Sequence, residues 1–247
     1  MKSFVFVLCT IIAFGLPIVL MIKWRNQTGC RIIPFIVGAL CFSMFATVLE
    51  PIFHTFFLVT NKETANFLYS TPIAYALYAG LAAGIFEETG RLFGFKVLLK
   101  KYSGKENSIA YGIGHGGIEC ILTLGITYLL YSIVILGGSL GDPSTDETIM
   151  QTINSIDIGF VFLAIIERIL AITLHIGLSI LVYAAVNDKK YRYLFVVAIL
   201  IHTIADVPAG LYQAKAITSL IVIELLTAII SGLTIYLALK IYKKMEE

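Results

Sequence analysis

Long apolar stretches separated by short polar segments dominate the pattern of this chain. Seven stretches of about 20 or more mostly apolar residues cover residues 3–22, 32–59, 72–99, 108–137, 156–186, 191–212 and 216–239. A helix of ~20 apolar residues is long enough to cross the hydrocarbon core of a bilayer. The pattern therefore predicts an all-α, polytopic transmembrane bundle of about seven spans, built as one domain over residues 1–247.

The composition supports a membrane protein and excludes other classes. Hydrophobic residues make up 58% of the 247 residues and charged residues only 14%, whereas soluble domains carry roughly 25% charged residues. A disordered chain, a basic arm that binds nucleic acid and an ordinary soluble domain are all excluded. The expected surroundings are the lipid bilayer, and no nucleic-acid partner is expected.

The positive charges lie on one side of the predicted bundle. Thirteen of the 18 lysines and arginines follow spans one, three and five or lie at the C-terminal end, whereas three lie on the opposite side. Loop 138–155 is acidic and contains no lysine or arginine. Because cytoplasmic loops of membrane proteins are enriched in lysine and arginine, the charges predict an external N-terminus and a cytoplasmic C-terminus.

The spans contain an excess of acidic side chains. Each charged group inside a membrane costs at least ~2.5–3.5 kcal/mol on insertion scales. The acids are Glu50, Glu87, Glu88, Glu119, Glu167, Asp206 and Glu224, against Arg91 and Arg168 and the four histidines His54, His115, His175 and His202. Seven carboxyl groups cannot all be ionised beside two arginines in a low-dielectric interior. Protonation, a bound cation or water is required, which points to a function beyond anchoring.

The spacing of these residues predicts a shared pocket. Four pairs are separated by four residues and so share a helix face: Glu50/His54, Glu87/Arg91, His115/Glu119 and His202/Asp206. The topology puts the polar residues of spans three, four and six at similar depth, near the midplane or in its cytoplasmic half. Glycines four residues apart, which allow close helix contact, occur at Gly80/Gly84, Gly90/Gly94 and Gly112/Gly116. Acids and imidazoles of these spans are therefore expected to meet.

Three short runs carry a family resemblance. The runs at 87–91 (EETGR), 111–115 (YGIGH) and 202–206 (HTIAD) resemble the three motifs of the CAAX-protease and bacteriocin-processing (CPBP) superfamily of intramembrane peptidases. The run GHGGIE at 114–119 is similar to YhfC-type membrane peptidases. The resemblance implies an intramembrane endopeptidase of a bacterial cytoplasmic membrane, acting on a membrane-associated peptide or protein.

The resemblance also implies residue roles. Glu87 would be the general base that activates water, with His115 supporting it. His202 and Asp206 would stabilise the oxyanion. Glu88 and Arg91 would support the first motif, and Glu119 follows His115 in the second. In this glutamic-type mechanism no cofactor is expected.

Other functions remain open at this stage. A zinc-dependent peptidase could use ligands His115, Glu119, His175 and His202, with Glu87 activating a bound water, although the usual HExxH signature is absent from the sequence. A proton- or cation-coupled transporter could use the same acids and histidines as a relay. A non-catalytic membrane scaffold is a third class. The sequence assigns no role to Glu50/His54, Glu167/Arg168 or Glu224.

Overall fold

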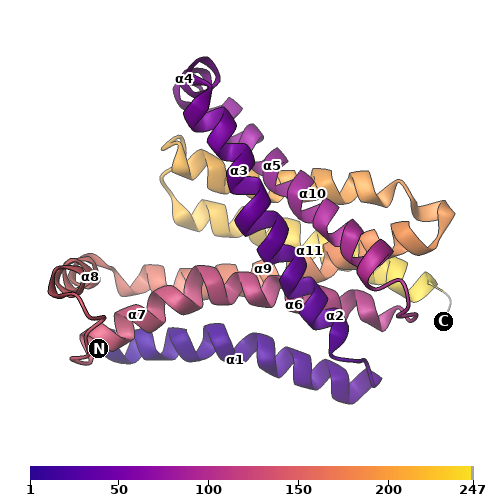
Figure 1. Ribbon diagram of the computed structural model, residues 1–247, viewed down its shortest axis with the longest axis horizontal. Coiled ribbons are helices and arrows are strands. Elements are labelled where there is room, and N and C mark those ends of the chain that lie inside the picture. Colours follow the sequence, from indigo (N-terminus) through magenta and orange to yellow (C-terminus); the bar gives the residue numbers. More distant parts are fainter. Residues whose placement is uncertain (246–247) are drawn as a thin grey trace.

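The computed structural model describes residues 1–245, which form helices joined by short connections and contain no strand (Figure 1). Within residues 1–245, six helices are long and apolar enough to cross a membrane: Lys2–Thr28, Ile33–Thr60, Glu106–Ile135, Ile158–Asn187, Lys189–Gln213 and Leu220–Lys244. A bent pair, Lys62–Ser70 and Pro72–Leu98, brings the number to seven, with an angle of 114° between its two helices. The predicted all-α polytopic bundle is confirmed, and each predicted span ends within about six residues of the observed one.

The spans are built from the following elements. The first half of the chain contains α1 (Lys2–Thr28), α2 (Ile33–Met44), α3 (Glu50–Thr55), α4 (Lys62–Ser70), α5 (Pro72–Phe93), α6 (Glu106–Cys120) and α7 (Ile126–Ile135). The second half contains α8 (Pro143–Ser155), α9 (Ile158–Asn187), α10 (Leu194–Gln213) and α11 (Leu220–Lys244). Short π-helical turns join α2 to α3 and α6 to α7, so each of these pairs forms one continuous span. Such turns occur frequently near functional sites.

The start of α1 and the end of α11 lie at opposite ends of the bundle (Figure 1). The N-terminus lies beside α8. The end of α11 lies near the connection between α5 and α6, where Nζ of Lys105 donates to the carbonyl oxygen of Met245 at 3.2 Å. This arrangement agrees with an odd number of crossings. The external N-terminus and cytoplasmic C-terminus remain a prediction from the distribution of lysine and arginine.

Two short helices occupy segments that the sequence analysis treats as loops. The side chain of Asn61 caps α4 by accepting a hydrogen bond from the backbone N–H of Thr64. The side chain of Asp142 caps α8, and hydrogen bonds from Thr145 and Ser144 lower the pKa of this carboxyl to about 2. Capping residues directly before a helix satisfy its free N–H groups. Asn61 and Asp142 were therefore the features of the sequence that could have indicated the starts of α4 and α8.

Glycines let the helices that carry the polar residues approach closely. A Cβ atom at Gly84 of α5 would lie 2.8 Å from the carbonyl oxygen of Ile199 in α10. A Cβ atom at Gly112 of α6 would lie 2.6 Å from the Cα atom of Ile176 in α9. The predicted close contacts at these glycines are confirmed. They place α5 against α10 and α6 against α9, which brings the four helices of the polar cluster together.

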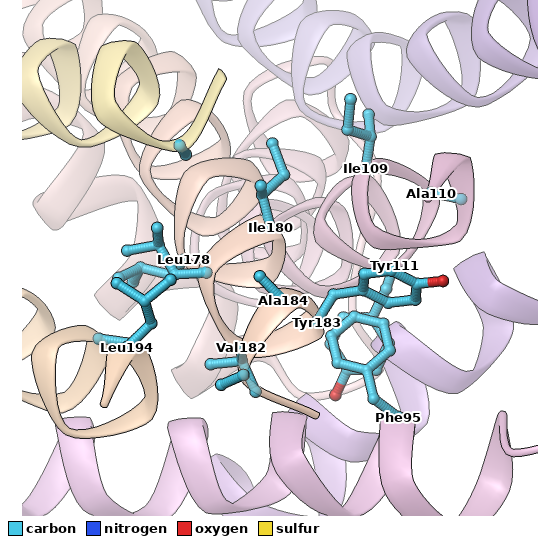
Figure 2. Packing of buried hydrophobic residues seen from close by; sticks show 14 of the residues in the cluster. Phe95, Ile109, Ala110, Tyr111, Leu178, Ile180, Val182, Tyr183, Ala184 and Leu194 are labelled. Atoms are coloured by element: carbon cyan, nitrogen blue, oxygen red, sulfur yellow. The ribbon is translucent and has the colours of Figure 1, made fainter. Parts of the chain in front are cut away.

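An apolar core supports one side of this arrangement. The ring of Phe95 lies 4.6 Å from the ring of Tyr111 and 5.3 Å from that of Tyr183, measured between centroids. Figure 2 shows these rings together with Leu178 of α9. All four residues are buried. The core therefore fixes the positions of α6 and α9 relative to the end of α5, in the half of the bundle that is predicted to be cytoplasmic.

Replacing Gly112 with alanine is expected to destabilise the protein by about 1–3 kcal/mol, because the added methyl group must displace the backbone of α9. Gly15 provides the matched control, since a Cβ atom there has nothing within 4 Å. Alanine at that position should be neutral or stabilising by up to ~1 kcal/mol, because it favours the helix. Unfolding of both variants in detergent would be measured. Equal stability of the two would contradict the close contact between α6 and α9.

Candidate active site

Four helices bring a cluster of ionisable side chains together inside the bundle. Helix α5 contributes Glu87, Glu88 and Arg91; α6 contributes His115 and Glu119; α9 contributes His175; and α10 contributes His202 and Asp206. The side chains of Glu88, Arg91 and His115 are fully buried. The expected meeting of spans three, four and six is present, and the fifth span joins it through His175.

Glu87 lies at the centre of the cluster. Its Oε2 atom lies 2.8 Å from Nε2 of His115, within hydrogen-bonding distance. The same oxygen lies 3.7 Å from Nε2 of His202 and 4.0 Å from Nδ1 of His175. One carboxylate oxygen is therefore surrounded by imidazole nitrogens from three other helices.

Arg91 pairs with Glu88, three residues before it, although it also shares a helix face with Glu87. Its guanidinium donates to both carboxylate oxygens of Glu88, at 2.9 and 3.1 Å. It also donates to Oγ of Ser179 at 2.6 Å and to the carbonyl oxygen of His175 at 3.0 Å. Positions three and four residues away share one helix face, so the spacing could not choose between the two acids. Glu87 instead turns toward α6.

Side chains from adjacent helices hold Glu87, His202 and His175 in place. His115 hydrogen-bonds Glu87, as described above. Oε1 of Glu88 lies 2.7 Å from Nδ1 of His202, and Oε2 of Glu119 lies 2.6 Å from Nε2 of His175. A carboxylate that contacts one imidazole nitrogen fixes the ring. This contact leaves Nε2 of His202 facing Glu87, whereas Nδ1 of His175 also lies 3.2 Å from Nη2 of Arg91. His175 and His202 are therefore held in defined orientations.

The cluster contains a possible metal-binding group. One ligand atom each from Glu87, His175 and His202 lies within 4.8 Å of the other two, and all three residues are buried. Two imidazoles and one carboxylate match the donors that hold catalytic zinc, which uses three protein ligands. Of the four ligands that the sequence suggests, His175 and His202 belong to this group, whereas His115 and Glu119 contact its members. Glu87 takes the third position.

A cavity of about 280 Å³ that is lined by both ionisable and apolar side chains lies beside this group. Its walls include Glu87, His175, His202, Asp206, Arg168 and Glu224. Arg168 forms ion pairs with Glu119, at 2.7 Å, and with Glu167. Glu167, Arg168 and Glu224, to which the sequence assigns no role, therefore line the same cavity as the central cluster.

Comparison with known proteins identifies the family. Residues 12–227 match the family described as the YhfC intramembrane metalloprotease. The chain belongs to this family. A relative described as an "Uncharacterized membrane protein YhfC", from Bacillus subtilis (strain 168), is 34% identical over 239 residues, which cover 93% of this chain and 92% of the relative. No solved structure matches the chain.

The family assignment confirms the YhfC resemblance and the multi-pass location in a bacterial cytoplasmic membrane. It also indicates an intramembrane protease. The expectation of a cofactor-free enzyme is not supported, because the family is described as a metalloprotease and the cluster contains a suitable donor set. Zinc, the alternative in the sequence analysis, is compatible with both observations.

Ser179 is a residue of the cluster that the sequence analysis missed. It lies one helical turn after His175, and its hydroxyl accepts a hydrogen bond from Arg91 while donating one to the carbonyl oxygen of His175. The spacing of four residues between His175 and Ser179 on one transmembrane helix could have indicated that both residues face the cluster. Since serine is common at helix contacts inside membranes, that signal alone could not identify a partner for arginine.

Proposed function

We propose that this protein is a zinc-dependent endopeptidase that cleaves peptide bonds of membrane-associated peptides or proteins. The observation that carries the proposal is the convergence of ligand atoms from Glu87, His175 and His202 within 4.8 Å. The family description supports the same reaction class. Glutamate and histidine side chains, rather than cysteine thiolates, are the donors found in zinc peptidases.

The three proposed ligands come from three different helices, α5, α9 and α10. Three protein ligands leave further coordination positions for water or substrate. When bound, zinc would act as a Lewis acid on the peptide carbonyl and on a water molecule. His115 would hold the carboxylate of Glu87. Glu88 would accept a hydrogen bond from Nδ1–H of His202, so that Nε2 of that ring faces the site.

We assign the proton transfers to Asp206. Its Oδ2 atom lies 3.5 Å from Nε2 of His202, and its side chain is 39% exposed, far more than that of Glu87 at 10%. Asp206 would accept a proton from the attacking water as the oxygen of that water bonds to the carbonyl carbon. It would then deliver the proton to the amide nitrogen as the C–N bond breaks. A carboxylate beside the cavity can reach both groups.

A metal-free mechanism is the second candidate. The hydrogen bond of 2.8 Å between Glu87 and His115 favours it, because a carboxylate and an imidazole in contact can together remove a proton from water. In that case Glu87 is the base and His202 with Asp206 stabilises the oxyanion, as the CPBP resemblance implies. The substrate class is the same in both mechanisms.

Zinc content distinguishes the two mechanisms. Protein purified without chelators is expected to contain roughly one zinc per chain. His175→Ala and His202→Ala should each lower the zinc content by at least about tenfold, because each removes a proposed ligand and so weakens the binding of zinc. Glu224→Gln is the matched control, because Glu224 lines the cavity without belonging to the ligand group. Elemental analysis would be combined with cleavage of a quenched peptide library.

Two outcomes would contradict the proposal. Metal-free wild-type protein whose peptide cleavage is insensitive to chelators would establish the metal-free mechanism instead. Proton-coupled uptake into liposomes that is lost in His202→Ala, without any peptide cleavage, would indicate a transporter.

A further inference from the structure

A second polar cluster lies outside the proposed catalytic group. Nδ1 of His54 lies 2.8 Å from the hydroxyl of Tyr78, and Nε2 of His54 lies 3.1 Å from Oε1 of Glu50. These residues come from α3 and α5. Ionisable side chains inside a membrane are expensive and usually mark a pathway or a site. The proposed reaction uses none of the three.

This second cluster lines a cavity of about 430 Å³, here called the vestibule. Its walls include Glu50, His54, Tyr75, Tyr78, Asp206 and Gln213. Asp206, Ala209 and Gln213 also line the cavity beside Glu87. The two cavities therefore adjoin each other at the residue to which we assign the proton transfers.

The vestibule follows the contact between α5 and α10. On α5, Tyr75, Ala79 and Ala83 line it at intervals of four residues, and Glu87 follows one turn later. Glu87 lies twelve positions after Tyr75, which corresponds to about 18 Å along the helix axis. The small alanines leave space between the two helices. At the far end, the hydroxyl of Tyr75 donates to Oε1 of Gln213 at 3.1 Å, where α10 ends.

Aromatic rings pack around Tyr78 of the second cluster. The ring of Phe53 stacks on that of Tyr78 at 6.1 Å between centroids, and the ring of Phe57 lies 5.9 Å from the same ring. The polar groups of Glu50 and His54 are mostly covered, with side chains 12% and 28% exposed.

We propose that the vestibule is filled with water and is the route by which water reaches the catalytic cluster from the end of the bundle where α5 begins. Ordered water needs a site that is polar and large enough, with two to four hydrogen-bonding partners for each molecule. The side chains of Glu50, His54, Tyr78 and Asp206 supply such partners along the path. Glu50, His54 and Tyr78 thus form a water-binding site. The hydration of the vestibule does not depend on the proposed function, whereas the supply of water to peptide hydrolysis does.

Cysteine labelling tests the hydration of this route directly. Single cysteines would replace Ala79 and Ala83, which line the vestibule, and Leu77 and Leu81, which are exposed on the outer surface of α5. The four native cysteines, all buried, would first be replaced by alanine. A charged methanethiosulfonate reagent should label Ala79→Cys and Ala83→Cys in liposomes at least about tenfold faster than Leu77→Cys and Leu81→Cys, because only the thiolate reacts and its formation needs water.

Equal, slow labelling at all four positions would overturn the proposal. The test does not depend on catalysis, so fast labelling of a protein that cleaves no peptide would refute the proposed function and leave the vestibule in place. In an active protein, Ala83→Trp should lower cleavage severalfold while retaining the zinc content, because the indole fills the route. Leu81→Trp is its matched control. Unchanged cleavage in Ala83→Trp, despite folded protein, would exclude this route as the supply of water.

Discussion

Replacing Glu87 with glutamine is expected to remove the bound zinc, because it takes away one of the three proposed ligands. Peptide cleavage should fall by roughly 10²- to 10⁴-fold, as much as the loss of a general acid–base group would lower it. The amide keeps the size of the side chain but loses the negative charge. The oxygen that lies 2.8 Å from His115 and 3.7 Å from His202 then becomes a neutral and much poorer ligand. Quenched-peptide kinetics and elemental analysis would be run on the same preparation.

Asp206→Asn separates the two roles of a carboxylate in this site. It should lower cleavage over a similar range of about 10²- to 10⁴-fold while zinc content stays at the wild-type value, because Asp206 lies outside the group of ligand atoms. Glu224→Gln should change neither quantity. A Glu87→Gln protein that retains zinc but has lost cleavage would show that Glu87 is the base, and the ligand assignment would then be wrong.

Replacing Arg91 with methionine is expected to destabilise the protein by about 3–5 kcal/mol, because the carboxylate of Glu88 would remain buried without its cation. Arg91 and Glu88 are both fully buried and joined by two hydrogen bonds. The double variant Glu88→Gln/Arg91→Met should recover part of this loss, since it removes the uncompensated charge. Unfolding would be followed in mixed detergent micelles.

Two control variants test whether the effect of Arg91→Met comes from the buried ion pair. Arg91→Lys keeps the positive charge but cannot make the paired hydrogen bonds, so its stability should lie between that of the wild type and that of Arg91→Met. Lys101→Met removes an exposed cation and should change stability by no more than about 0.5 kcal/mol. If Arg91→Met were as stable as Lys101→Met, the buried ion pair would have no structural role.

The sequence predicted the membrane spans well because the signal for each is summed over some 20 residues. It also predicted that the acids and histidines meet, since the topology alone sets the depth of each residue within its span. The close contacts at Gly84 and Gly112 followed from the spacing of small residues. These features depend on length and period, which a single sequence contains.

The sequence could not predict which side chains contact each other. Glu87 and Glu88 both lie within reach of the face that carries Arg91, and the choice between them depends on the rotation of α5 against α6 and α9. The same rotation places Glu87, rather than His115, among the possible ligand atoms. The contact of Glu119 with His175 and Arg168 also depends on packing between helices. Spacing along one helix contains no such information.

The distribution of the proposed ligands along the chain has a consequence for biogenesis. Glu87 lies on α5, His175 on α9 and His202 on α10, so the group is complete only after most of the polypeptide has been synthesised and inserted. A nascent chain that stops before α10 lacks one imidazole and one wall of the cavity. The protein should therefore be unable to hydrolyse peptides until α10 has been inserted. The growing chain and its neighbours at the translocon would be protected from premature proteolysis.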